Sequence, residues 1–160
     1  MLFVMAATML SLTSCDDDKI ARSLDGVWEG EISTAYFNYR GSGNSQYVDI
    51  QFFTDPSQYA KGTGTEWDYS NITETYTECD FDFEVRNGRI YLYYADGVDV
   101  VIRNYELHDG RFSGEFLDRN GNLLATFDLY RVENWRHLRS GYNYRYTASE
   151  NKGERHKVEV

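Results

Sequence analysis

The histidines and cysteines are the residues of this chain that could supply a nucleophile or bind a transition metal. His108, His137 and His156 have neither a His-Glu-x-x-His spacing nor another paired-ligand spacing, so they do not predict a zinc site. The sequence also has no Gly-x-Ser-x-Gly elbow and no phosphate-binding loop. Cys79 shares one face of its segment with the apolar Phe81 and Phe83 and is expected to be a small buried core residue. We therefore expect no enzymatic activity, no metal and no cofactor.

A stripe of carboxylates alternates with other residues between positions 78 and 84 and could in principle bind calcium through its oxygens. Alternate residues of a strand line up along one face and do not converge on a single point. The stripe is therefore better explained as the solvated outer face of a sheet. Its members are Glu78, Asp80, Asp82 and Glu84.

Turn dipeptides divide the second half of the chain into short segments of alternating polarity. Asn-Gly and Asp-Gly between such segments are the strongest short-range signal for a β-hairpin. If each dipeptide is a two-residue turn, the register is fixed, and Val85 pairs with Ile90 while Tyr105 pairs with Gly114. The dipeptides are Asn87-Gly88, Asp96-Gly97, Asp109-Gly110 and Asn120-Gly121.

The same alternation predicts eight strands in all. Five lie between Thr75 and Val132, and the three upstream candidates are Gly26 to Thr34, Gln46 to Thr54 and Lys61 to Tyr69. Consecutive antiparallel strands with one apolar face close most simply into an up-and-down barrel, because closure leaves no exposed edge. We therefore expect an all-β fold, an eight-stranded antiparallel barrel, with a two-sheet β-sandwich as the alternative.

Arg103 breaks the alternation, because the two-residue turns on either side place it inside the barrel, between Ile90 and Phe116. A buried guanidinium stays charged and costs several kcal/mol when it is unpaired. Arg103 could therefore bind a ligand carboxylate, whereas a β-bulge that turns it outward is the alternative. The other residues expected in this ligand site are Trp67, Tyr94 and Tyr105.

The N-terminal segment has the features of a membrane-targeting signal. Residues 1–14 carry no charge, and their apolar part is shorter than the roughly 20 residues that a bilayer core of about 30 Å requires. Its length is that of the apolar region of a signal peptide. Leu12-Thr13-Ser14-Cys15 resembles the lipobox of bacterial lipoproteins. The resemblance implies that residues 1–14 are removed and that Cys15 is lipidated and becomes the membrane anchor.

Three aspartates, Asp16 to Asp18, follow this cysteine directly. Together with it they resemble the export signal of surface lipoproteins in Bacteroides-type bacteria. In enteric-type bacteria, an aspartate in this place resembles an inner-membrane retention signal instead. A third interpretation is a solvated spacer, because adjacent like charges repel one another. We expect residues 15–24 to form an acidic tether and the protein to lie in the outer membrane, at the cell surface or on the periplasmic face.

The charge distribution separates the body of the chain from its C-terminus. The formal net charge of −10 argues against nucleic acid as a partner, because phosphates would be repelled. After Trp135 the balance reverses, with six Lys and Arg residues against three Glu. The expected organisation is thus a barrel over residues 25–135, followed by a basic, flexible tail over residues 136–160.

Two segments that flank the expected barrel resemble the lipocalin pattern. They are LDGVWEGE, which begins at Leu24, and LYRVENW, which ends at Trp135. In lipocalins a Gly-x-Trp, here Gly26 and Trp28, closes the barrel floor, and an arginine after the last strand, here Arg131, lies across the indole. The chain is most similar in these features to lipocalin-like lipoproteins of Bacteroides-type bacteria.

Two functions follow from this resemblance and from the strand register. The first is a tethered carrier that holds a small apolar or amphipathic molecule in the barrel, with a carboxylate bound by Arg103 as in fatty-acid-binding relatives of lipocalins. The second is a solid barrel whose outward aromatic residues bind a glycan or a surface protein. Those outward residues are Tyr91, Tyr93 and Tyr130. A cavity volume distinguishes the two functions.

Overall fold

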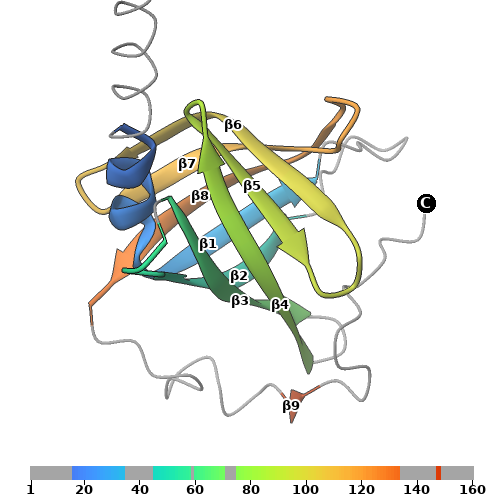
Figure 1. The fold of residues 1–160 in the computed structure, drawn as a ribbon. Helices are drawn as coiled ribbons and strands as arrows, with labels where there is room; N and C mark the ends of the chain where they lie inside the picture. The colour runs from blue at the N-terminus through green and yellow to red at the C-terminus, as the bar shows by residue number, and fades with distance from the viewer. Residues whose placement is uncertain (1–15, 35–44, 59, 71–74, 134–146, 149–160) are drawn as a thin grey trace, which may run out of the picture.

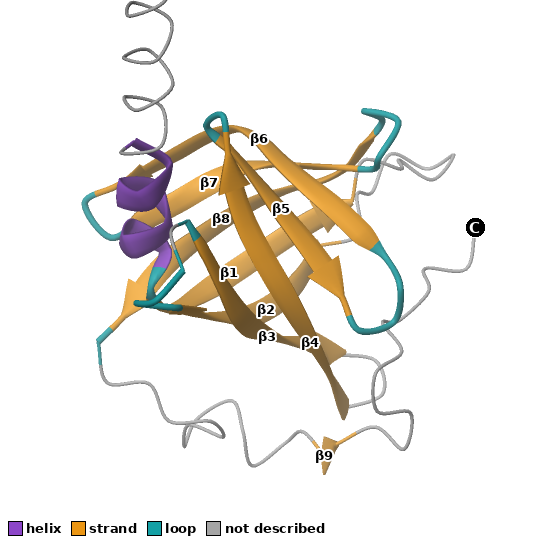
Figure 2. Cartoon of the chain, viewed as in Figure 1, coloured by secondary structure: helices purple, strands orange, loops and turns teal. Residues whose placement is uncertain are grey.

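A closed barrel of eight antiparallel strands forms the body of the molecule (Figure 1). The computed structural model describes residues 16–34, 45–58, 60–70, 75–133 and 147–148. A helix over residues 16–24 lies at one end of the barrel, and a short ninth strand lies at its side (Figure 2). The strands are β1 (Gly26–Thr34), β2 (Ser45–Thr54), β3 (Lys61–Ser70), β4 (Thr75–Arg86), β5 (Arg89–Tyr94), β6 (Asp99–His108), β7 (Arg111–Leu117), β8 (Leu123–Val132) and β9 (Thr147–Ala148).

Each barrel strand pairs with its neighbours in the sequence, and the pairing of β1 with β8 closes the circle. This topology confirms the up-and-down barrel, and the β-sandwich alternative is wrong. β9 lies outside the circle and runs parallel to β4 at Thr75 and Tyr76. The pairing of Val85 with Ile90 is the one that a two-residue turn at Asn87-Gly88 predicts. Phe112 pairs with Leu129, although the β7–β8 connection over residues 118–122 is longer than two residues.

Aromatic side chains fill the interior from the helix end to the middle of the barrel. Phe52 makes edge-to-face contacts with Phe81 and Phe83, with ring centroids 5.3 and 5.4 Å apart. Phe112 packs against Phe127 at 4.7 Å. Such pairs add to the stabilisation that burial of the rings already provides. The packed rings leave no room for a long acyl chain in this half of the barrel.

The floor of the barrel is closed around Trp28, which is 1% exposed. Its indole Nε1 donates a hydrogen bond to the Leu24 carbonyl at 2.7 Å. The Arg131 guanidinium lies 4.8 Å from the centre of the indole and donates to the Ser23 carbonyl at 2.5 Å. Arg131 therefore connects the last strand, the tryptophan and the helix end. This is the arrangement that the lipocalin resemblance implies.

The helix over residues 16–24 corrects the expectation of an acidic tether. Ala21 and Leu24 are fully buried against the barrel core, and Ile20 packs beside them. Carboxylates at the start of a helix interact favourably with the helix dipole, and Asp18 also pairs with Arg22 at 2.7 Å. The aspartates therefore begin a helix that covers the barrel floor, and an extended spacer is the wrong description of this segment.

Asp17 joins this helix to the β4–β5 hairpin. Its carboxylate accepts hydrogen bonds from the backbone N–H groups of Asn87 and Gly88, at 2.9 and 2.8 Å. Both residues have positive φ angles, 52° and 69°, as the tight turn between these strands requires. The turn thus presents two N–H groups to one buried carboxylate.

Replacing Asp17 should measure the strength of this junction. We expect Asp17→Ala to lower the free energy of unfolding by about 1.5–3 kcal/mol, the range for a hydrogen bond to a charged group. Urea denaturation followed by tryptophan fluorescence measures the change. Asp16→Ala is the matched control, because the exposed Asp16 pairs only with the exposed Lys19 among the described residues, and its loss should cost less than about 0.5 kcal/mol. Equal effects of the two changes would show that the junction contributes nothing.

Candidate ligand site at the barrel mouth

A cavity of about 160 Å³ lies inside the barrel at the end opposite the helix. Residues from seven of the eight strands contribute to its walls. One side is apolar and the other carries carboxyl, hydroxyl and amide groups. The lining residues are Ile32, Thr34, Gln46, Glu66, Asp68, Tyr94, Val100, Phe116, Leu124 and Ala125. The cavity is thus a small amphipathic chamber at the barrel mouth.

Two buried carboxylates, Glu66 and Asp68, form the polar wall. They are 4% and 7% exposed and occupy alternate positions of β3, so both face inward. The Tyr94 hydroxyl donates a short hydrogen bond to Glu66. Removing a carboxylate from water costs several kcal/mol unless partners compensate. Neighbouring buried carboxylates within a barrel therefore favour a positively charged or hydrogen-bond-donating group beside them.

Two further polar groups near these carboxylates have no hydrogen-bond partner among the described residues. They are the Thr77 hydroxyl and the Gln46 side-chain nitrogen, and both atoms are buried. Thr77 is 3% exposed and lies directly opposite Asp68 in the pairing of β3 with β4. A buried polar group without a partner costs about 1–3 kcal/mol. The mouth therefore has unused hydrogen-bonding capacity beside its carboxylates.

The size and lining of the cavity define the chemistry of its occupant. Its volume is close to the roughly 150 Å³ of an apolar protein cavity that holds one benzene molecule. Ile32, Val100 and Leu124 can contact a small apolar body, while Glu66 and Asp68 can accept hydrogen bonds from an ammonium or hydroxyl group. A carboxylate would be repelled at this site. The arrangement suits a small amphipathic cation.

Arg103 does not lie in the barrel, and its predicted role in binding a carboxylate is wrong. It is exposed and lies opposite Glu115, while Ile102 occupies the inward position between Ile90 and Phe116. The β5–β6 connection spans residues 95–98 and is longer than the two-residue turn assumed, which moves the register by one position. A shift of one residue exchanges the two faces of a strand.

A β-bulge in β6, directly after Arg103, restores the predicted register for the rest of the β6–β7 hairpin. The pairing of β6 with β7 shifts between Arg103 and Glu106, and Asn104 has a positive φ of 49°. Asparagine tolerates this left-handed conformation better than most residues. The predicted pairing of Tyr105 with Gly114 is lost, but the Tyr105 Cβ would still lie 2.8 Å from a Cβ at Gly114.

Trp67 faces outward, away from the cavity. Its indole Nε1 donates to Glu78 at 3.0 Å, and its ring belongs to a cluster with Tyr47, Tyr69 and Tyr76. In this cluster the Tyr69 hydroxyl donates to Asp49 at 2.8 Å. Burial, followed by the Asp49 charge, raises the pKa of Tyr69. Trp67 is therefore part of an outer aromatic cluster, and its prediction as a lumen residue is wrong.

Tyr105 lies at the closed floor, far from the mouth along the barrel. Its ring packs edge-to-face on Phe112 at 6.1 Å, and its hydroxyl donates to the Gly88 carbonyl at 3.1 Å. Burial, followed by the charge of Asp17, raises the pKa of Tyr105. Of the four residues expected in the ligand site, Tyr94 lines the mouth cavity.

The sequence-based prediction missed Glu66 and Asp68. The bulky Trp67 and Tyr69 alternate with them, and this pattern suggested that the aromatic face of β3 is the inner one. Gly62 was a better indication of the inner face of β3, because it lies on the same face as Glu66 and Asp68. A Cβ at Gly62 would lie 2.5 Å from the Phe83 ring. Glycine on the inner face of β3 makes room for the large rings of β4.

The part of the chain that the structure describes contains neither a cluster of metal-ligating side chains nor a membrane-spanning helix. No group of three His, Cys, Asp or Glu residues gathers there in a way that could hold a metal ion. No helix within the described ranges is long and apolar enough to cross a bilayer. Cys15 and most of the tail over residues 136–160 lie outside the described residues, so the lipidation and tail predictions stay predictions.

No protein-family model matches the sequence, and no curated protein sequence is significantly similar to it. Among solved structures, the chain is similar to the crystal structure of Rv2717c from M. tuberculosis. The two chains are 12% identical, and the match covers 73% of this chain and 98% of the other with a TM-score of 0.47.

Proposed function

We propose that the protein is a membrane-tethered lipoprotein whose barrel binds a small amphipathic cation at its mouth. The observation that carries the binding proposal is the pair of buried carboxylates, Glu66 and Asp68, in the wall of the mouth cavity. The packed aromatic interior argues against a fatty-acid carrier, because it leaves only about 160 Å³ at the mouth. A single ring or a short branched chain with an amino group fits that volume.

The tether follows from the N-terminal sequence. The proposal places the lipid on Cys15 and the barrel in the aqueous phase beside the outer membrane, at the cell surface or on its periplasmic face. The helix over residues 16–24 then holds the barrel floor close to the anchor. Because the mouth lies at the opposite end of the barrel, it would face away from the lipid.

Isothermal titration calorimetry with three molecules of similar shape tests the binding proposal. We expect the purified full-length chain to bind benzylamine, to bind the neutral benzyl alcohol more weakly, and not to bind benzoate. Glu66→Gln should weaken benzylamine binding by about 1.5–3 kcal/mol, the range for a hydrogen bond to a charged group.

Asp128→Asn is the matched control, because this carboxylate lies on the outer face of β8 and pairs with Arg111 at 2.8 Å. The change should leave benzylamine affinity unaltered. Benzoate binding as tight as that of benzylamine, or equal benzylamine affinities for wild type and Glu66→Gln, would contradict the proposal.

A further inference from the structure

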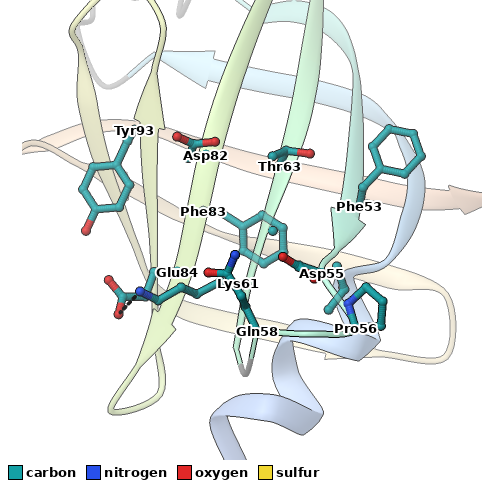
Figure 3. A pocket seen from close by; sticks show the side chains of 12 residues that line it. Phe53, Asp55, Pro56, Gln58, Lys61, Thr63, Asp82, Phe83, Glu84 and Tyr93 are labelled. Atoms are coloured by element: carbon teal, nitrogen blue, oxygen red, sulfur yellow. Dashed lines mark ion pairs between the residues drawn. The ribbon is translucent and has the colours of Figure 1, made fainter.

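A second hollow lies on the outer face of the barrel, where β2, β3, β4 and β5 adjoin the loop after β2. Its volume is about 550 Å³, and Figure 3 shows Phe53 on one side of it and Tyr93 on the other. An adjoining hollow of about 410 Å³ shares Phe53, Thr63, Asp82 and Tyr93. The two hollows together form one outer groove, which is separate from the mouth cavity.

The sheet register places the four shared residues in a single row across the strands. Phe53 lies opposite Thr63, Thr63 opposite Asp82, and Asp82 opposite Tyr93. At a strand spacing of about 4.8 Å, the backbones at Phe53 and Tyr93 are roughly 14 Å apart. The two aromatic rings are 52% and 37% exposed. The groove is thus bounded by two accessible rings, with a hydroxyl and a carboxylate between them.

The rows on either side continue this polar floor. On one side Thr65 donates a hydrogen bond to Asp80 at 2.7 Å. On the other side Lys61 and Glu84 form an ion pair at 3.7 Å, marked in Figure 3. Glu84 is paired with Lys61, whereas Asp82 presents its carboxylate to solvent. The floor therefore offers hydrogen-bond acceptors and a negative potential.

These features favour a carbohydrate over other occupants. The faces of sugar rings carry C–H groups that pack on aromatic rings, and sugar hydroxyls donate readily to carboxylates. A peptide could not extend the sheet at this groove, because β3 and β4 are paired on both sides along this row. A polyanionic glycan would be repelled by Asp80 and Asp82.

We propose that the outer groove binds a neutral oligosaccharide, with sugar rings packed on Phe53 and Tyr93 and hydroxyl groups hydrogen-bonded to Asp82. The contacts with the sugar would come from side chains on the outer face of the sheet. It does not depend on the mouth cavity, so the two sites can be occupied at the same time.

Calorimetric titration of the full-length chain with cellohexaose, maltohexaose and N-acetylchitohexaose tests this inference. At least one of these should bind, and an alginate hexamer should not. The double variant Phe53→Ala/Tyr93→Ala should weaken the binding at least tenfold, and Asp82→Asn should weaken it severalfold. Thermal unfolding curves of the variants should match that of the wild type, because all three side chains are exposed.

Tyr130→Ala is the matched control, because Tyr130 is a 54% exposed tyrosine on β8 that lines neither hollow. It should bind the oligosaccharide as the wild type does. The inference is overturned if none of the three neutral oligosaccharides binds, or if binding persists in the double variant. A titration with hexalysine tests for a basic peptide as the occupant of this negatively charged groove. Binding of hexalysine without binding of any oligosaccharide would identify a peptide site and would also overturn the inference.

Discussion

Replacement of Trp28 by alanine is expected to lower the free energy of unfolding by about 3–5 kcal/mol, as for large-to-small changes in other protein cores. The indole is 1% exposed and packs edge-to-face on Phe112 with ring centroids 5.6 Å apart. Its removal would also eliminate the hydrogen bond to Leu24 and the contact with the Arg131 guanidinium. The change therefore combines a large cavity with the loss of the contacts that hold the helix on the floor.

Urea denaturation followed by circular dichroism measures this loss of stability. Tyr130→Ala is the control, because removal of an exposed tyrosine should change the free energy of unfolding by no more than about 0.5 kcal/mol. A loss below about 1 kcal/mol for Trp28→Ala would show that the floor does not depend on the indole.

The Cys15→Ala variant is expected to lose its lipid-dependent attachment to the membrane. If the lipid on Cys15 is the anchor, the variant should appear in the soluble fraction or remain unprocessed. A single acyl chain binds membranes only marginally, whereas several chains together hold a protein firmly. Cell fractionation followed by detergent extraction measures the distribution.

Cys79→Ala is the matched control for this experiment, because Cys79 is 3% exposed in the barrel core. That variant should stay in the membrane fraction. If the Cys15→Ala chain were processed and still required detergent for extraction, the lipoprotein assignment would be wrong.

Much of the fold follows from short-range sequence signals. The Asn87-Gly88 and Asp109-Gly110 turns adopt the positive φ angles that their residue types favour, and the flanking pairs have the predicted register. Strand order follows because consecutive hairpins with one apolar face close on themselves most simply. Turn residue types and alternating polarity were therefore sufficient to predict the strand register where the connection was a two-residue turn.

The errors arose where the loop length or the backbone departed from that simplest case. Asp96-Gly97 lies in a connection over residues 95–98, and a bulge follows Arg103, so one residue of shift reversed the inferred face of Arg103. Asn104 carries no sequence signal strong enough to place that bulge. The helix over residues 16–24 was missed because its three consecutive aspartates suggested repulsion, while its apolar positions Ala21 and Leu24 are few.

The candidate site was the least predictable part of the molecule. Tyr94 was expected in the ligand site, and its cross-strand pairing with the buried Phe81 places it on the inner face of the barrel. Glu66 and Asp68 were not expected there, because buried carboxylates contradict the general rule that charged residues face water. Residues that violate this rule are often functional. Their position becomes evident only once the register of β3 against β4 is known.

The central claim is that a small cation binds between Glu66 and the apolar wall of the mouth. Two-dimensional ¹H–¹⁵N NMR spectra of the full-length chain during titration with benzylamine test it most directly. The claim predicts saturable shifts at the backbone amides of Gln46, Glu66 and Tyr94, with those of Asn87 and Gly88 at the floor unchanged. No saturable shifts, or shifts confined to the floor or to the outer groove, would contradict it.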